Sequence, residues 1–134
     1  MAYTLSFESL HKYDLKESGI DVPVELRLGS NEIRLAAKLD TGASLCIFQR
    51  AYGESLGLNI ESGLEQEVGT ANSTFVTYGH EITLACLDLE VNLVAYFAKE
   101  HTIKRNVLGR EGWLNRIRVG LIDHDGELYV NTYG

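Results

Sequence analysis

Hydrophobic and polar residues alternate along much of the chain, which is the pattern of strands with one buried face. Two alternating runs, Val22–Leu28 and Ile33–Leu39, flank the turn-forming residues Gly29-Ser30-Asn31. Strands joined in this way form a β-hairpin. A shorter apolar run at 45–48 predicts a further strand.

The middle of the chain continues this pattern. Residues 75–78 are good strand formers, and residues 82–86 alternate again. Residues 91–98 are predicted to form a continuous buried strand, and a turn at 88–90 separates it from the preceding one.

Two segments have a helical pattern instead. Residues 50–56 predict a short helical turn that stops near Gly57. Residues 109–118 are the strongest helix candidate, because Trp113 and Ile117 fall on one face. Strands at 119–122 and 127–130 follow, joined by a turn that contains Asp125-Gly126. The pattern as a whole predicts a mainly β protein with one short helix in its C-terminal half.

Length and charge restrict the possible functions. The chain has 134 residues, which suits a single domain over 1–134. Nineteen acidic against twelve basic residues give a net charge of −7. Nucleic-acid binding rests on clustered Lys and Arg, so we expect no nucleic-acid partner. The N-terminus lacks a secretory pattern, and no apolar run approaches the ~18 residues of a membrane span, so we expect a cytoplasmic protein without a membrane partner.

Cysteines and histidines give no metal signature. Cys46 and Cys86 lie in apolar runs and are predicted to be buried free thiols. The four histidines are not spaced as zinc ligands with them. Asp123-His124-Asp125 is predicted to be a turn rather than a metal site. We therefore expect neither a metal nor a cofactor.

The candidate chemistry lies in Asp40-Thr41-Gly42, between a predicted strand and a second apolar strand. Farther along, the segment Asn106-Val107-Leu108-Gly109-Arg110 places two apolar residues and a glycine at the start of the predicted helix. Asp-Thr-Gly alone is weak evidence, since an acidic residue at the end of a strand often only caps a turn.

Together these two segments resemble the retropepsin-like aspartic proteases. Asp40-Thr41-Gly42-Ala43 is similar to their active-site loop, and Asn106-Val107-Leu108-Gly109-Arg110 to their second signature, in which residues 107–110 are the core. The resemblance covers about residues 22–130 and implies a closed β-barrel or sandwich. Viral members often carry an acidic residue after this loop, paired with the arginine of the second signature. This chain has Ser44 there, which leaves a partner for Arg110 open.

The resemblance also implies the site. Asp40 would be catalytic, with Thr41 and Gly42 shaping its loop. Ala43 and Ser44 would contact the substrate, as would Thr70, Ala71, Asn72 and Ser73 at the tip of a mobile flap hairpin over 69–80. The N-terminal extension, 1–16, is expected either to form an interface strand or to be disordered.

A single Asp-Thr-Gly raises the question of stoichiometry. Hydrolysis by two carboxylates needs an acid and a base on either side of one water, and one loop supplies only one of them. The second Asp40 must then come from another copy of the chain. The leading hypothesis is a homodimeric aspartic endopeptidase that acts on an extended peptide. The alternatives are a dimerisation or peptide-binding module with little catalysis, and a β-barrel ligand binder with an isolated Asp40.

Overall fold

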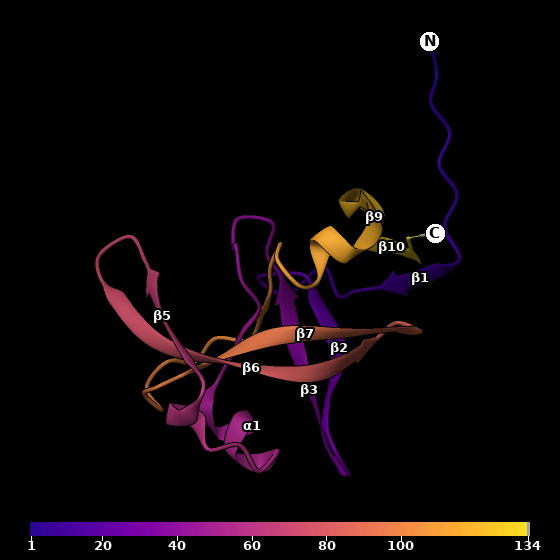
Figure 1. Cartoon of the computed structure of the whole chain (residues 1–134). Coiled ribbons are helices and arrows are strands. Elements are labelled where there is room, and N and C mark those ends of the chain that lie inside the picture. Colours follow the sequence, from indigo (N-terminus) through magenta and orange to yellow (C-terminus); the bar gives the residue numbers. More distant parts are fainter. Residues whose placement is uncertain (134) are drawn as a thin grey trace.

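The computed structural model describes residues 1–133, and it is mainly β, as predicted (Figure 1). The strands are β1 (Ser9–Lys12), β2 (Asp21–Leu28), β3 (Asn31–Leu39), β4 (Ile47–Phe48), β5 (Leu64–Gly69), β6 (Thr74–Cys86), β7 (Leu89–Ala98), β8 (Val107–Leu108), β9 (Ile117–Ile122) and β10 (Glu127–Thr132). The other regular elements of the described residues are one α-helix, α1 (Arg50–Ser55), and three 3₁₀ turns (Ile60–Ser62, Leu114–Arg116 and Asp123–Asp125).

Seven strands form the main sheet, in the order β2-β3-β8-β4-β7-β6-β5. An additional antiparallel pairing joins β2, the first strand of this order, to β6, the last but one, and closes a barrel from which β5 extends. The predicted hairpin of β2 and β3 is present, with Val24 opposite Leu35. The alternating side chains of β2, Val22, Val24 and Leu26, are buried in the barrel as their period of two requires.

A second sheet has three strands in the order β1-β10-β9. Residues 9–12 of the N-terminal extension therefore pair with the C-terminal strand of their own chain. Phe7 extends this contact, because its ring lies 5.9 Å from that of Tyr129. The Tyr13 hydroxyl donates a hydrogen bond to Asp123, and burial together with that carboxylate raises the pKa of Tyr13 to about 12. Residues 9–13 are thus part of the folded domain.

Bulky apolar side chains fill the space between the two sheets and α1. The largest of the fully buried ones are Trp113, Phe48 and Phe97. The rings of Phe48 and Phe97 lie 6.0 Å apart in a tilted arrangement that is favourable for aromatic pairs. Trp113 comes from the segment after β8, so the core holds in place the chain that follows the second signature.

The helix predicted over 109–118 does not form. Residues 114–116 make only a 3₁₀ turn, and the α-helix of the described residues is the shorter segment at 50–55. Gly112 has a φ of +96°, which interrupts any right-handed helix. The N–H of Leu114 donates to Gly109, five residues back, rather than at α-helical spacing. Trp113 is buried as expected, but as part of a compact turn.

The turn predicted at 88–90 lies one residue earlier. Leu87 and Asp88 form a two-residue loop with φ values of 50° and 66°, and Cys86 pairs with Leu89. Two positive φ values match the right-handed twist of the strands that they join. The prediction missed this loop because leucine rarely adopts such a conformation.

The predictions for α1 and the cysteines are confirmed. Gly57, with φ of +87°, follows α1 where the stop was expected. Cys46 and Cys86 are buried free thiols, and burial raises their pKa to about 11 and about 12. Both thiols are therefore protonated near neutral pH and serve as core packing. Within residues 1–133, no helix is long and apolar enough to cross a membrane.

Candidate active site

Asp40 lies directly after β3, at a junction of three strands. Strand β8 runs parallel to β3, with Leu39 opposite Leu108, and antiparallel to β4. The N–H of Asp40 donates to the carbonyl of Leu108 at 3.0 Å. The first residue of the motif is thus held by the strand of the second signature, 68 residues farther along the chain.

The loop after Asp40 orients its carboxylate. The N–H of Gly42 donates to Oδ1 of Asp40 at 2.9 Å, and the N–H of Ala43 donates to the Asp40 carbonyl at 3.2 Å. A Cβ on Gly42 would lie 3.3 Å from that same carboxylate oxygen. The glycine therefore lets the loop pass close to the carboxylate, which stays partly exposed and open to a reactant.

The second signature holds the other side of this loop. The N–H of Arg110 donates to the Ala43 carbonyl at 2.9 Å, and the N–H of Glu111 donates to the Ser44 carbonyl at 2.8 Å. A Cβ on Gly109 would lie 2.2 Å from the carbonyl oxygen of Leu45. The two motifs are thus packed backbone against backbone, at a distance that only glycine allows at position 109.

Two predicted site side chains have no partner within residues 1–133. Thr41 is exposed, and no hydrogen bond of the described part engages its hydroxyl. Arg110 is also exposed and forms no ion pair there, in keeping with a serine rather than an acidic residue at position 44. Their backbones belong to the site, whereas their side chains are available for other contacts.

Asn106 opens the second signature, but no separate role was predicted for its side chain. Its carbonyl accepts from the N–H of Lys38 at 2.9 Å, and its Oδ1 accepts from the N–H of Gln49 at 3.1 Å. Asn106 thus joins β3 through its backbone carbonyl and the start of α1 through its side chain. Its place directly before the apolar pair Val107-Leu108 was the available signal.

A cleft of about 230 Å³ opens beside Asp40. Ala43 and Ser44, for which substrate contact was predicted, line it. The cleft is also lined by residues 66–69 of β5 and by Arg105, and of these only Gly69 lay within the predicted flap. Residues 66–68 and Arg105 were missed because residues far apart in the chain come together at this cleft only in the folded barrel.

Residues 70–73 form the tip of the β5–β6 hairpin and do not line this cleft. The N–H of Thr70 donates to the Ser73 carbonyl at 2.7 Å, and the Thr70 hydroxyl donates to the same oxygen at 2.9 Å. Ala71 and Asn72 between them are exposed. The hairpin exists where the flap was expected, with a tip closed by its own hydrogen bonds and its β5 flank toward Asp40.

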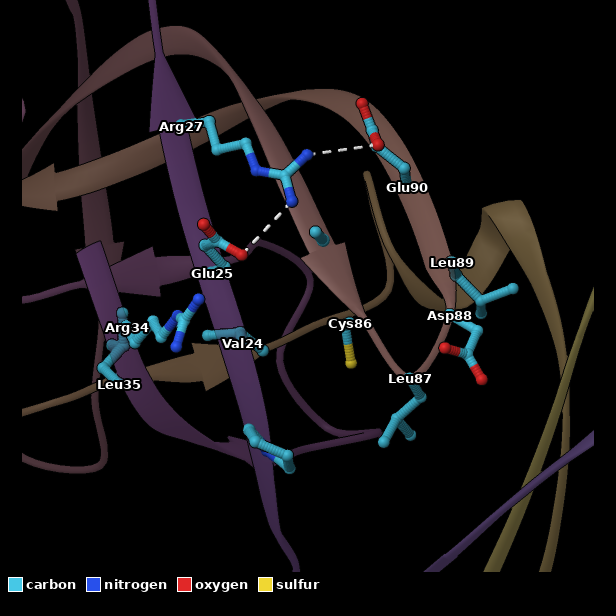
Figure 2. A pocket seen from close by; sticks show the side chains of 12 residues that line it. Val24, Glu25, Arg27, Arg34, Leu35, Cys86, Leu87, Asp88, Leu89 and Glu90 are labelled. Atoms are coloured by element: carbon cyan, nitrogen blue, oxygen red, sulfur yellow. Dashed lines mark hydrogen bonds and ion pairs between the residues drawn. The ribbon is translucent and has the colours of Figure 1, made fainter. Parts of the chain in front are cut away.

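A larger cleft of about 490 Å³ lies elsewhere, next to the β6–β7 turn (Figure 2). The guanidinium of Arg27 donates to Glu25 and to Glu90, each at 3.2 Å. The hydrogen bond from Arg27 lowers the pKa of Glu25, and the hydrogen bond with Glu25 raises the pKa of Glu32. Cys86 in this cleft is a protonated thiol. The hydrogen bonds of Arg27 link β2 to β7, and the residues of this cleft include no reactive nucleophile.

The described residues were also compared with the side-chain groups that bind metal ions. Among residues 1–133, no three His, Cys, Asp or Glu side chains gather in a way that could hold a metal ion. Asp123-His124-Asp125 forms a 3₁₀ turn that ends at Gly126, with φ of +66°. The candidate chemistry of the described residues is therefore the carboxylate of Asp40.

Comparison with known proteins points to one family. A family model described as aspartyl protease matches residues 22–112, which include both motifs and the hairpin between them. The search of curated proteins found no match.

Solved structures show the same fold. The chain is similar to EIAV protease complexed with the inhibitor HBY-793, with a TM-score of 0.57, 20% identity, and 75% of this chain and 88% of that chain covered. It is also similar to a retropepsin-like aspartic protease from Rickettsia conorii, with a TM-score of 0.59, 18% identity, and 83% and 89% covered. The predicted retropepsin-like barrel is thus confirmed.

Proposed function

Because this chain belongs to the aspartyl protease family, we propose that it is an aspartic endopeptidase that works as a homodimer with Asp40 from each subunit as its catalytic pair. The observation that carries this proposal is the loop geometry. Asp40 sits at a strand end with its carboxylate oriented by the Gly42 N–H and open to a cleft. The residues predicted around it, Ala43, Ser44 and the second signature, surround it through backbone hydrogen bonds.

The proposed chemistry follows from two carboxylates held close together. Aspartic proteases are the well-known case of such a pair, which shares one proton because both members cannot easily ionise together. The ionised carboxylate takes a proton from water, and the protonated one polarises the peptide carbonyl. The Gly42 N–H donates to Oδ1 of Asp40 and so orients the carboxylate. No metal or covalent intermediate is needed for these steps.

The arrangement of the fold supports a second copy as the source of the other carboxylate. The Asp40 loop, the tip of the β5–β6 hairpin and the β1-β10-β9 sheet all lie toward the same side of the molecule (Figure 1). In the small sheet β9 is an outer strand, and Leu121 and Ile122 on it are 48% and 46% exposed. An outer strand with exposed apolar residues is a template for pairing. A two-fold axis on this side would bring two Asp40 loops together.

Digestion of a peptide library tests the function directly. We expect the native chain to cut peptides at acidic pH, and we expect a statine-type transition-state mimic to block cleavage. A well-formed dimer in sedimentation without cleavage of any peptide would favour the binding module instead. A monomer at all concentrations would favour the barrel ligand binder with an isolated Asp40.

The first prediction concerns the pH optimum and residue 43. We expect a bell-shaped rate profile centred at roughly pH 4.5–6, because the pair works with one shared proton. Ala43 has no hydroxyl with which to stabilise the ionised form. We expect Ala43→Ser to add such a donor and to displace the optimum to lower pH by about one unit. Rates for one peptide from pH 2 to 8 measure both profiles.

The substitution is expected to leave the loop itself in place, since the N–H of Ala43 donates to Asp40 and its carbonyl accepts from Arg110 whatever the side chain. Equal urea midpoints of the two proteins provide the control. A serine variant displaced to higher pH, or a native optimum near pH 3, would contradict this role of residue 43.

The second prediction concerns the hairpin as a mobile flap. Residues 64–67 of β5 and the tip at 70–73 are exposed, so few buried contacts hold them. We expect amide hydrogens of 66–73 to exchange fast in the free protein and at least ~10-fold more slowly with a bound peptide inhibitor. The amides of β7, which is central in the barrel, should exchange slowly in both states. Equal exchange of 66–73 with and without inhibitor would exclude closure.

A further inference from the structure

The clefts on either side of Asp40 share two lining residues, Asp40 itself and Arg105. The first is the 230 Å³ cleft toward β5. The second, of about 540 Å³, lies toward the start of β2 and is also lined by Lys38 and Lys104. A peptide chain that runs through both clefts would therefore pass Arg105, which lies shortly before β8.

The contact that holds Arg105 in this position leaves its positive charge without an ion-pair partner. Its guanidinium lies over the ring of Phe75 on β6, 5.9 Å from the ring centroid. A guanidinium on an aromatic face keeps its N–H donors free at the edge of its plane. Within residues 1–133, no ion pair or side-chain hydrogen bond engages Arg105. The side chain is partly buried, so its unused donors border the cleft.

Other charged residues also line these two clefts. Lys38 is paired with Asp21 at 3.6 Å, whereas Lys104 is exposed and forms no ion pair within the described residues. Glu67 lines the first cleft but lies beyond ion-pair distance of Arg105. Arg105 and Lys104 thus adjoin Asp40 without an ion-pair partner among residues 1–133, in clefts that the carboxylates of Glu67 and Asp21 also line.

We infer that Arg105, assisted by Lys104, selects peptide substrates that carry a carboxylate side chain beside the scissile bond. This inference rests on the proposed function. The planar guanidinium can donate two parallel hydrogen bonds to one carboxylate, a geometry that an amide cannot reproduce. Glutamate side chains are ionised from about pH 5 upward, which overlaps the expected working range. Arg105 contacts the substrate in this scheme and does not take part in proton transfer.

The test uses the best-cleaved library peptide, remade with Glu, Gln or Lys at each residue flanking the cut bond. At pH 6 and low salt we expect kcat/KM for one Glu peptide to exceed that of its Gln counterpart by ~10-fold or more, since hydrogen bonds to charged groups are the strong ones. In Arg105→Gln the two peptides should fall within about twofold of each other. Arg105→Lys should retain part of the preference. Arg105→Glu should favour the Lys peptide.

Arg34→Gln is the matched control. Arg34 is an exposed arginine of β3 without an ion pair within the described part, and it lines neither cleft at Asp40. The Glu preference should be unchanged in this variant. Urea unfolding of each variant shows whether the fold is intact, and Arg105→Lys serves if Arg105→Gln is unfolded.

The possible failures are distinguishable. Equal cleavage of Glu and Gln peptides by the native chain would overturn the inference and leave the protease in place. A loss in Arg105→Gln that is equal for all peptides would also overturn it, because Arg105 would then act on Asp40 rather than on the substrate. If no peptide is cut, the proposed function fails. Fluorescence anisotropy of the labelled Glu and Gln peptides with the native chain then decides whether Arg105 selects the carboxylate.

Discussion

Replacing Asp40 by Asn is expected to abolish peptide hydrolysis and to leave a folded dimer. Asn has the same shape, and its Oδ1 can still accept the Gly42 N–H that now meets the carboxylate at 2.9 Å. The amide can neither take a proton from water nor share one with its symmetry mate. General acid–base steps contribute ~10²–10⁴-fold, so we expect at least a ~10³-fold loss in kcat. Peptide cleavage, sedimentation and urea unfolding measure the three properties.

Mixing the variant with the native chain tests whether the pair spans two subunits. If each active site needs Asp40 from both chains, mixed dimers are inactive. After equilibration of equal amounts, activity should fall to about a quarter of that of the same total of native chain. Sites that need only one chain would retain about half. Full activity of Asp40→Asn alone would remove Asp40 from the mechanism.

The second large effect is expected from Gly109→Ala. Its Cβ would lie 2.2 Å from the Leu45 carbonyl oxygen and 2.8 Å from that of Ala43. Both atoms belong to the backbone, so no side-chain rotation can relieve the contact. The strand β8 must then move away from the Asp40 loop, and the hydrogen bond from Arg110 to Ala43 must lengthen. We expect unfolding to become easier by at least ~3 kcal/mol, and any remaining folded protein to be inactive.

Gly69→Ala is the matched control for stability. A Cβ at Gly69 meets no atom within 4 Å, and its φ is not in the left-handed region. Its urea midpoint should stay within about 0.5 kcal/mol of the native value. If Gly109→Ala were as stable as Gly69→Ala and as active as the native chain, the close packing of the two motifs would not be needed to hold Asp40.

Local periodicity was sufficient for most of the barrel. Alternation over residues 22–28 and 33–39 predicted β2 and β3, because a strand with one buried face must repeat every two residues. Periodicity gave the wrong element for residues 109–118, where helical spacing predicted a helix that does not form. Trp113 and Ile117 lie at helical spacing, yet Gly112 turns the chain and the buried Trp113 is placed by the core. Spacing reports which residues are buried and cannot report which local turn buries them.

The candidate site also contains residues that the sequence predicted and residues that it did not. Asp40, its loop and the glycine of the second signature were recognisable from sequence, because close backbone packing and a carboxylate at a strand end demand particular residue types. The contact of the Asn106 side chain and residues 66–68 of β5 along the cleft were not. An asparagine side chain that accepts from the N–H of Gln49 has no local pattern, since its partner is set by a distant segment.

The chain by itself determined a mainly β domain, its catalytic candidate and the count of one such residue per copy. These features depend on composition, hydrophobic periodicity and short motifs, all of which can be read directly from the sequence. Only the tertiary structure decided that β2 pairs with β6 to close the barrel, that β1 pairs within its own chain, and that Arg105 lines both clefts at Asp40. Strand pairing and side-chain convergence join residues far apart in the chain, and their energies depend on the complete set of contacts rather than on neighbours in sequence.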